Sequence, residues 1–265
     1  MGEIRFFMEE STVAVDPTPS IREAAQEMRH HSISSILISE IGNYTGILTD
    51  TDLTRKFAAK NMDQDHTLVS IIATNPIITL DADHLMEEAY ECMRNKNIRH
   101  LGVTEKDEMI GILSIKDFAN YYNFKFCQDK NKEDQIGHYM RERLETVPES
   151  TSIHKAARLM KENKIGSLLV TLNDDITGIV TEEIFTRKVL GDNLNPETTL
   201  VSELMEKPTT IKATQSMDSA LSCMHQNDAR YLAVTEDNKI IGVISRKDLT
   251  IYYKHKFVTA QDIDE

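Results

Sequence analysis

The apolar positions of this chain recur at helical spacing in some stretches and gather into short runs in others, and the two patterns alternate. Apolar residues at i, i+3, i+4 and i+7 begin at Ile21 and again, with the same offsets, at Ile153. A short apolar run precedes the first of these stretches at residues 13–15, and two further runs follow it at residues 36–38 and 46–48. The pattern predicts a strand, an amphipathic helix and a β-hairpin, in that order.

This order of elements recurs four times, less regularly in the second copy than in the others. In the second copy we predict the first strand at Ile77–Ile78 and a helix whose buried face holds Leu85, Ala89, Cys92 and Met93. Each hairpin leads into a second helix. The predicted repeat is therefore β-α-β-β-α, and the fold class is α+β.

A short motif ends each hairpin and sets the length of the repeat. It consists of a glycine, two aliphatic residues, a hydroxyl residue, two variable residues and, in three of the four copies, an aspartate. The copies occupy residues 46–52, 111–117, 178–184 and 242–248, and their glycines are 65, 67 and 64 residues apart. Such regular spacing identifies an internal repeat. The composition of the motif is typical of a buried strand that turns directly into a helix.

The four repeats resemble one another in pairs, which indicates that a module of two repeats was duplicated. Residues 32–37 match residues 164–169, and residues 68–70 match residues 200–202. We predict two pseudo-twofold pairs with a boundary in the polar stretch at 129–134. The predicted repeats are 1–60, 61–128, 135–192 and 197–257, which form module 1 (1–128) and module 2 (135–257).

Composition argues against several classes of protein. The 265 residues are 40% hydrophobic and carry a net charge of −13, and so acidic a chain is a poor binder of duplex nucleic acid. No apolar run approaches the ~18 residues that a membrane helix needs. The N-terminus lacks the profile of a signal peptide. We therefore expect a soluble cytoplasmic protein with neither a nucleic-acid duplex nor a membrane as its partner.

Motifs for catalysis and for metal binding are missing from the sequence. Cys92, Cys127 and Cys223 are odd in number and lack metal-type spacing, and Cys92 and Cys223 stand at equivalent positions, where we expect small buried apolar side chains. The nine histidines show no ligand spacing either. Phosphate-loop, dinucleotide-binding and nucleophile-elbow motifs do not occur. We predict no enzyme, no metal site and no required cofactor.

The motif at the end of each hairpin permits two interpretations. As a capping box, its hydroxyl and carboxylate satisfy free amides in the first helical turn. As a ligand site, the same helix start offers amides and a positive dipole to a phosphate, the carboxylate accepts two ribose hydroxyls, and the glycine lets the ligand approach the backbone.

Basic residues around the motif favour the ligand interpretation. Lys116, Arg246 and Lys247 fall in predicted first turns, where a cation is unfavourable unless an anion binds nearby. Arg99 and Arg230 fall on the predicted hairpin strands of repeats two and four, where repeats one and three have small residues. The alternative for the two arginines is an exposed charge on a strand edge. Together with the helix starts, they favour an anion pocket.

The repeated β-α-β-β-α unit with this motif after its last strand resembles the CBS domain, whose tandem pairs are called Bateman modules. The resemblance covers nearly the whole chain. It implies a ligand cleft between the two repeats of a pair, for AMP, ADP, ATP or S-adenosylmethionine. In that family the motif aspartate holds the ribose, the hydroxyl and nearby basic residues meet phosphates, and apolar strand residues flank the base.

The resemblance places candidate ligand-binding residues in three of the four repeats. The third repeat departs from the pattern because Ile184 stands where the aspartate belongs, and isoleucine cannot accept ribose hydroxyl protons. We predict that this site is empty or degenerate. The candidate residues are Thr49, Asp52, Ser114, Asp117, Ser245, Asp248, Arg99, His100, Arg230, Gly46, Gly111 and Gly242.

The hypothesis drawn from the sequence is a non-enzymatic regulatory protein. It senses an adenine nucleotide or S-adenosylmethionine, changes the relative angle of its modules and passes that change to a client protein. We expect the exposed helices of the modules to pack against each other in a flat disc, either within one chain or in a homodimer. The alternative is a ligand-free adaptor whose repeats form a surface for dimerisation and protein binding.

Overall fold

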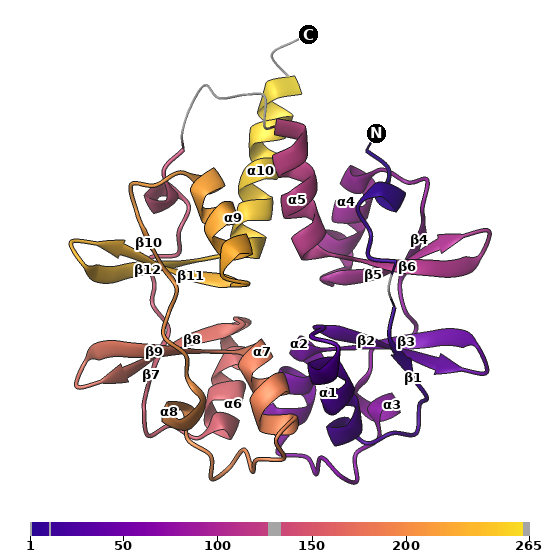
Figure 1. Cartoon of the computed structure of the whole chain (residues 1–265), viewed down its shortest axis with the longest axis horizontal. Coiled ribbons are helices and arrows are strands. Elements are labelled where there is room, and N and C mark those ends of the chain that lie inside the picture. The colour runs from indigo at the N-terminus through magenta and orange to yellow at the C-terminus, as the bar shows by residue number, and fades with distance from the viewer. Residues whose placement is uncertain (1, 11, 127–133, 262–265) are drawn as a thin grey trace. The chain divides into compact units, whose positions relative to one another are not determined.

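The computed structural model describes residues 2–10, 12–126 and 134–261 (Figure 1). The chain forms two compact units, each assembled from segments that are distant in sequence. Repeats two and four share unit 1, and repeats one and three share unit 2. Unit 1 comprises Met1–Ser11, Ile78–Leu144 and Pro208–Glu265, and unit 2 comprises Thr12–Ile77 and Glu145–Lys207.

Each repeat contains one three-stranded sheet of the same topology, as the sequence predicts. The first strand runs parallel to the second, and the second pairs antiparallel with the third. The strands are β1 (Ala14–Val15), β2 (Ser35–Glu40) and β3 (Asn43–Thr49) in repeat one; β4 (Thr79–Asp81), β5 (His100–Glu105) and β6 (Glu108–Ser114) in repeat two; β7 (Thr146–Pro148), β8 (Ser167–Leu172) and β9 (Asp175–Thr181) in repeat three; and β10 (Thr210–Lys212), β11 (Tyr231–Glu236) and β12 (Lys239–Ser245) in repeat four.

The first helix of each repeat buries one face, and in three repeats the predicted residues form that face. In the first repeat Ile21, Ala24, Ala25 and Met28 are all buried. Their hydrophobic burial, more than helix propensity, holds so short a helix in place. These helices are α1 (Ile21–His30), α4 (Met86–Lys96), α6 (Ile153–Asn163) and α9 (Met217–Gln226).

Two predictions for the second repeat are wrong. Leu85 lies outside α4 as its N-cap and is 48% exposed, while Met86 takes the buried position, because the backbone of Leu85 bridges to Glu3 instead. The first strand is Thr79–Asp81, later than the predicted Ile77–Ile78. Pairing with β5 begins only at the Ile78 carbonyl, which accepts the amide of Gly102.

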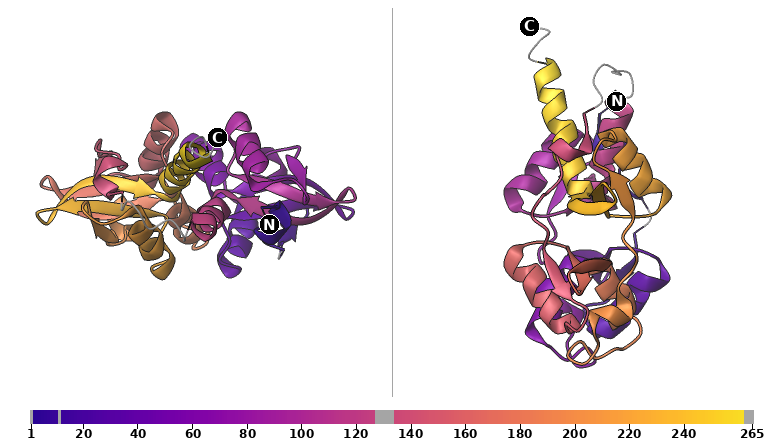
Figure 2. Two further views of the ribbon diagram at one scale, coloured as in Figure 1. Left: turned by 90° about the horizontal axis from the view of Figure 1, so that it is seen from above. Right: turned by 90° about the vertical axis from the view of Figure 1, so that its left-hand side faces the viewer.

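The second helix follows each hairpin directly, but its form differs between the units. In unit 1 it is one continuous α-helix, α5 (Ile115–Phe126) or α10 (Arg246–Gln261), and Figure 2 shows α10 from two further directions. In unit 2 it begins with one turn, α2 (Asp50–Asp52) or α7 (Glu182–Ile184), and continues as a π-helix, η2 (Leu53–Phe57) or η5 (Phe185–Leu190). A short 3₁₀ turn, η3 (Ala58–Lys60), ends the helix of repeat one. Sequence patterns of apolar spacing do not distinguish these helix types.

A short helix and the segment after it close each sheet on its third-strand side. The helices are η1 (Ile4–Phe6), α3 (Val69–Ile72), η4 (Ile136–His138) and α8 (Val201–Leu204). One residue after each helix makes an antiparallel bridge to the third strand of a sheet, and we call these four the bridging residues. They are Glu9 opposite Ile112, Thr74 opposite Ile47, Arg141 opposite Val243 and Glu206 opposite Ile179.

The core of unit 1 joins repeats two and four through their second helices. α5 and α10 lie side by side (Figure 1), and the hydroxyl of Thr250 donates to the carbonyl of Ile115 at 3.4 Å. Lys254 reaches from α10 to α4, where its Nζ lies 4.6 Å from the centroid of the Tyr90 ring. Aromatic side chains fill much of this core, including Phe118, Tyr121, Tyr122, Tyr252 and Tyr253.

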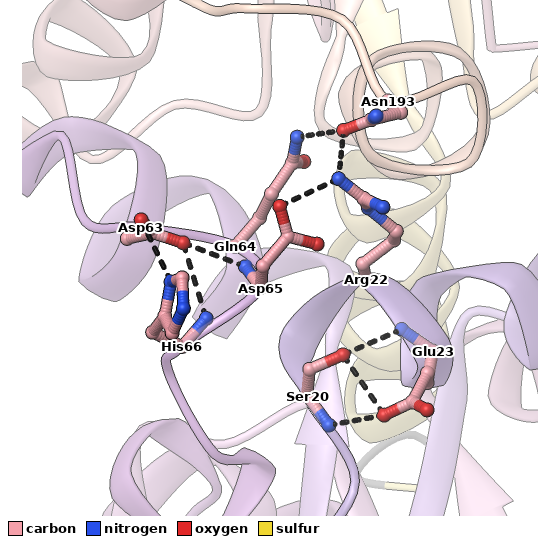
Figure 3. Close-up of polar contacts among 8 residues, drawn as sticks. All are labelled: Ser20, Arg22, Glu23, Asp63, Gln64, Asp65, His66 and Asn193. Carbon is pink, nitrogen blue, oxygen red and sulfur yellow. Dashed lines mark hydrogen bonds and ion pairs between the residues drawn. The ribbon is translucent and has the colours of Figure 1, made fainter.

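The core of unit 2 joins repeats one and three in a similar way. α1 packs against η5 of the other repeat, and α6 packs against η2 and η3. At the rim of this contact, Arg22 pairs with Asp65 at 2.6 Å, and both Arg22 and Gln64 donate to the side chain of Asn193 in repeat three (Figure 3). Helix contacts between repeats, which we predicted, therefore form within this one chain.

Three further predictions concern the cysteines, the module boundary and membrane helices. Cys92 and Cys223 are only half-buried at the edge of the unit 1 core, so the expected burial is incomplete. Cys127 and the greater part of the proposed boundary at 129–134 lie outside the described residues. Within residues 2–10, 12–126 and 134–261, no helix combines the length and the apolar character that crossing a membrane requires.

Candidate ligand-binding site

The hydroxyl residue of the motif caps the second helix in three repeats, where the hydroxyls of Thr49, Thr181 and Ser245 accept helix amides three residues on. In repeat two, Ser114 stands at the same position and donates to Asp117. In the three complete motifs, a single carboxylate oxygen, Oδ2, accepts from both the amide and the hydroxyl of the capping residue. The distances are 3.0 and 2.7 Å for Asp52 with Thr49, 2.7 and 2.7 Å for Asp117 with Ser114, and 2.9 and 2.5 Å for Asp248 with Ser245. The capping interpretation is confirmed, and it leaves the second oxygen, Oδ1, outside the cap.

The surroundings of that second oxygen differ among the three aspartates. Oδ1 of Asp52 lies 2.8 Å from Lys56 Nζ, and Oδ1 of Asp248 lies 3.0 Å from a guanidinium nitrogen of Arg141. Asp117 is different: in the described part of the chain, no Lys, Arg or His side chain lies within ion-pair distance of its carboxylate.

The ionisation of Asp117 reflects this difference. Burial raises the pKa of the carboxyl, and the negative charge of Glu9 raises it further, whereas the hydrogen bonds from Ser114 and the charge of Lys116 oppose both effects. Asp117 is therefore a buried acid that a new hydrogen-bond donor would stabilise in its charged form.

The third repeat keeps the cap without the carboxylate. The hydroxyl of Thr181 accepts from the amide of Ile184 at 3.2 Å. The Ile184 side chain is 5% exposed and belongs to the core of unit 2. That this site is empty or degenerate stays a prediction, but the side chain at the aspartate position has a packing role.

Arg99 and Arg230, each the residue just before a strand (β5 and β11), lie directly beside the helix starts. Their carbonyls accept the amides of the first helical residues, Ile115 at 2.9 Å and Arg246 at 3.1 Å. In unit 2 the carbonyls of Ser34 and Gly166 accept the equivalent amides. The basic residues are thus the unit 1 counterparts of small residues in unit 2, as the alignment of the repeats predicts.

Positive charges from two repeats meet around His100 in unit 1. Burial together with Arg99, Arg230 and Lys116 lowers the pKa of His100 to about 3. Arg230 belongs to repeat four and His100 to repeat two, so the effect shows that charges 130 residues apart in sequence come close in space. We call Arg99, Lys116 and Arg230 the cationic cluster.

The same region of unit 2 contains acids instead, a feature that the sequence analysis missed. Asp50 and Glu182 are the first helical residues, and each is 2% exposed. Glu182 pairs with Arg55 of the other repeat at 2.9 Å and accepts from the hydroxyl of Thr51 at 3.1 Å. A signal existed, because an acid directly follows the motif hydroxyl only in repeats one and three. Unit 2 therefore carries its own buried anions where unit 1 carries cations.

The glycines of the motif make room for the chain itself. A methyl group on Gly111 would lie 2.7 Å from the carbonyl oxygen of Glu9, and one on Gly242 would lie 2.4 Å from the sulfur of Met140. At Gly46 a methyl group would overlap the side chain of Asn75. These glycines were predicted to admit a ligand; what approaches them here is the segment that carries the bridging residue. Their role toward a ligand stays a prediction.

Of the candidate residues, Gly46, Thr49 and Asp52 lie in unit 2, and the candidates of repeats two and four lie in unit 1. In unit 1 the two helices that begin at the motifs, α5 and α10, contact each other. No group of three or more His, Cys, Asp or Glu side chains in the described part of the chain is arranged to hold a metal ion.

Four small sheets, each followed by a helix that begins at the motif hydroxyl, with an acid three residues later in three of the four repeats, define a class of tandem-repeat protein. The chain belongs to the CBS domain family, whose model matches residues 2–59, 69–123, 136–191 and 201–255. The resemblance drawn from the motifs is thereby confirmed.

Relatives and solved structures agree with this assignment. The CBS domain-containing protein CBSCBSPB2 of Arabidopsis thaliana is 24% identical over 84% of this chain and 48% of its own length. The chain thus spans about half the length of such curated relatives. YhcV of Bacillus subtilis, also a CBS domain-containing protein, is 28% identical over 45% of this chain and 84% of its own length.

Two crystal structures share the fold along nearly the whole chain. Protein MJ1225 from Methanocaldococcus jannaschii superposes with a TM-score of 0.79 at 20% identity, and covers 95% of this chain and 99% of its own. An uncharacterised conserved protein from Pyrococcus horikoshii gives a TM-score of 0.60 at 17% identity, with the same coverage. At these identities the comparison concerns the fold alone.

Proposed function

We propose that this chain is a regulatory, non-enzymatic protein that binds an adenine nucleotide at the starts of α5 and α10. The observation that carries the proposal is the cationic cluster. A chain with a net charge of −13 gathers Arg99, Lys116 and Arg230 from two repeats beside two helix N-termini. Helix N-termini and guanidinium groups both favour phosphate, so this region offers an anionic ligand several favourable contacts.

The motif aspartates supply the second part of a nucleotide site. Each uses only Oδ2 in the helix cap, so Oδ1 can accept from ribose hydroxyls without loss of the cap. Among adenosyl ligands, the cationic cluster favours AMP, ADP or ATP over S-adenosylmethionine, because the sulfonium group of the latter is itself a cation. Which nucleotide binds depends on how many phosphate groups the cluster holds.

Regulation would follow from the contact between the two repeats of unit 1. A phosphate held by Arg99 of repeat two and Arg230 of repeat four binds most tightly to one arrangement of α5 and α10. It therefore shifts the population toward that arrangement, which a client protein can recognise.

Calorimetric titration with AMP, ADP, ATP and S-adenosylmethionine tests the proposal. The wild-type chain should bind at least one nucleotide, and the Asp117→Ala plus Asp248→Ala protein and the Arg99→Gln plus Arg230→Gln protein should each bind it at least tenfold more weakly. The matched control is Glu108→Ala plus Glu236→Ala, which removes two acids from exposed strand ends of the same unit. Heat absent from every titration of the wild-type chain would overturn the proposal.

A ligand-free adaptor is the second candidate, and one observation favours it. The hydroxyl and carboxylate of each complete motif already satisfy one another, so the motif has a full structural purpose without a ligand. An adaptor would capture the same client with and without nucleotide. Pull-down of a client from cell extract at zero and at 5 mM ATP separates the two roles, since a sensor requires the captured amount to change.

A further inference from the structure

The bridging residues are placed alike against the third strands of all four sheets. In unit 1, the amide of Glu9 donates to the carbonyl of Ile112 at 2.9 Å, and the amide of Arg141 donates to that of Val243 at 2.9 Å. In unit 2, Thr74 makes the equivalent bond to Ile47 at 2.8 Å. Each partner directly follows the motif glycine. The backbone therefore presents the bridging side chain at the same place in each repeat, and that side chain is glutamate in repeats two and three, threonine in repeat one and arginine in repeat four.

In repeats one and four that side chain reaches the second oxygen of the motif aspartate. Arg141 lies 3.0 Å from Oδ1 of Asp248, and the hydroxyl of Thr74 lies 3.4 Å from Oδ1 of Asp52. Glu9 is close enough to Asp117 for its negative charge to affect that carboxylate.

Repeat three lacks the motif aspartate, and its bridging residue has a different partner. Where the aspartate is replaced by Ile184, the bridging residue Glu206 pairs instead with Lys188 at 2.8 Å. Lys188 is the counterpart of Lys56, which in repeat one pairs with Asp52 at 2.8 Å. The bridging position thus faces either the motif aspartate or the lysine one turn beyond it.

We propose that the bridging residue determines which motif aspartate accepts a ligand, with Arg141 obstructing Asp248 and Glu9 leaving Asp117 open. This inference rests on the proposed function. Vicinal hydroxyls of a ribose need two acceptor positions on a carboxylate whose Oδ2 already receives two protein donors. At Asp248 a guanidinium also occupies Oδ1, so the ligand must displace it. At Asp117 the neighbouring charge is negative, so two ribose donors would displace no guanidinium and would offset the repulsion from Glu9.

The site of repeat two should therefore bind first. In repeat one, Lys56 contacts Oδ1 of Asp52 and Thr74 approaches it, so that site resembles repeat four more than repeat two. Because Arg141 is 50% exposed, its ion pair with Asp248 is modest and its removal should change the affinity by about fivefold.

The test changes the charge at each of the two bridging positions. Calorimetry then measures AMP binding in chains that keep one motif aspartate at a time. The Asp52→Ala plus Asp117→Ala chain retains only Asp248, and in that chain Arg141→Gln should tighten AMP binding by about fivefold. The Asp52→Ala plus Asp248→Ala chain retains only Asp117, and in that chain Glu9→Arg should weaken AMP binding by about fivefold. Circular dichroism confirms that each background is folded before titration.

Matched controls separate a specific effect from a change in overall charge. Arg143→Gln removes the same charge two residues beyond Arg141, and Glu10→Arg makes the same change beside Glu9; both positions are exposed, and both variants should leave the affinity unchanged. If a background fails to fold, the same substitutions in the otherwise wild-type chain should each move one binding step only.

Two results would overturn the inference. Weaker binding after Arg141→Gln would assign Arg141 to the ligand itself, and unchanged binding after Glu9→Arg would show that the bridging position has no influence on Asp117. Both results presuppose that the wild-type chain binds AMP. Failure of the proposed function is recognised separately, because the wild-type chain would then give no heat on titration with AMP.

Discussion

Arg55 Nε lies 2.9 Å from Glu182 Oε1, and this ion pair joins repeat one to repeat three inside unit 2. The carboxylate is 3% exposed, and the same guanidinium also donates to the carbonyl of Ile165 at 3.1 Å. A buried carboxylate needs such partners, because its desolvation is costly when it is left unpaired. The contact between these two repeats is therefore supported by charge as well as by apolar packing.

Removal of Arg55 should weaken unit 2 by more than the loss of an ordinary surface ion pair. Arg55→Gln leaves Glu182 buried with fewer donors, and we expect the free energy of unfolding to fall by about 2 kcal/mol, less than for a fully buried pair because Arg55 is 25% exposed. Urea unfolding monitored by circular dichroism measures the change.

The matched control for this substitution is Arg158→Gln in the same unit. Arg158 pairs with Glu162 at 3.4 Å, but both side chains are more than half exposed, so the free energy of unfolding should change by less than about 0.5 kcal/mol. Equal effects of the two substitutions would contradict a structural role of the Arg55 contact.

The close approach of Glu9 to Gly111 predicts that an added methyl group is poorly tolerated. Gly111→Ala would place that group 2.7 Å from a backbone oxygen, which cannot rotate away, so the segment around Glu9 must shift. We expect a loss of about 2 kcal/mol in the free energy of unfolding and faster hydrogen exchange at residues 4–9. Gly137→Ala is the control, because its methyl group would meet Ala213 at an ordinary 3.4 Å. Native exchange at residues 4–9 in Gly111→Ala would disprove the steric argument.

The capping hydroxyls predict a graded response at a single position. Ser245→Ala removes the oxygen that Asp248 binds at 2.5 Å, and it should lower the free energy of unfolding by about 1 kcal/mol. Ser245→Thr keeps the hydroxyl, as Thr49 and Thr181 do at the equivalent positions, and should cost little. Thermal unfolding measures both variants, and a similar loss in each would show that the side-chain volume, not the cap, matters here.

The features that could be predicted from the sequence are those that local residue order decides. A hydroxyl and an aspartate three positions apart form their cap within one helical turn, and apolar spacing identifies the helix face of Ile21 and Met28. The electrostatic effect of Glu9 on Asp117 and the ion pair of Arg55 with Glu182 join residues 108 and 127 positions apart. Only the tertiary fold decides such contacts, and a single sequence taken by itself does not reveal them.

A partial signal for the bridging residues was nevertheless present. Residues 9, 74, 141 and 206 are spaced by 65, 67 and 65 positions, close to the spacing of the motif glycines. Their identities differ in charge, and the repeat pattern therefore does not stand out by residue type. The π-helical form of η2 and η5 had no signal of this kind, because their apolar pattern also fits an α-helix.

His100 of unit 1 predicts how the stability of that unit depends on pH. The pKa of His100 is about 3 in the folded chain and 6.5 in an ordinary setting, because burial and the cationic cluster oppose its protonation. Between these values the unfolded chain binds the additional proton, so the free energy of unfolding falls as the pH is lowered from 6.5 toward 3. Between pH 7 and pH 5 the loss should be about 2 kcal/mol.

Comparison of the wild-type chain with His100→Gln isolates this contribution, since other groups titrate in both proteins. Burial and Arg246 also lower the pKa of His225. Burial raises the pKa of Asp117, so just above pH 3.8 the contribution of Asp117 to the free energy of unfolding rises as the pH is lowered. Urea unfolding at pH 5, 6 and 7 should show a steeper loss in the wild-type chain than in His100→Gln. Saturating ATP should reduce that difference, because a bound polyanion offsets the cationic cluster and lets His100 take up its proton. Parallel curves for the two proteins without ligand would mean that His100 is not held neutral by Arg99, Lys116 and Arg230.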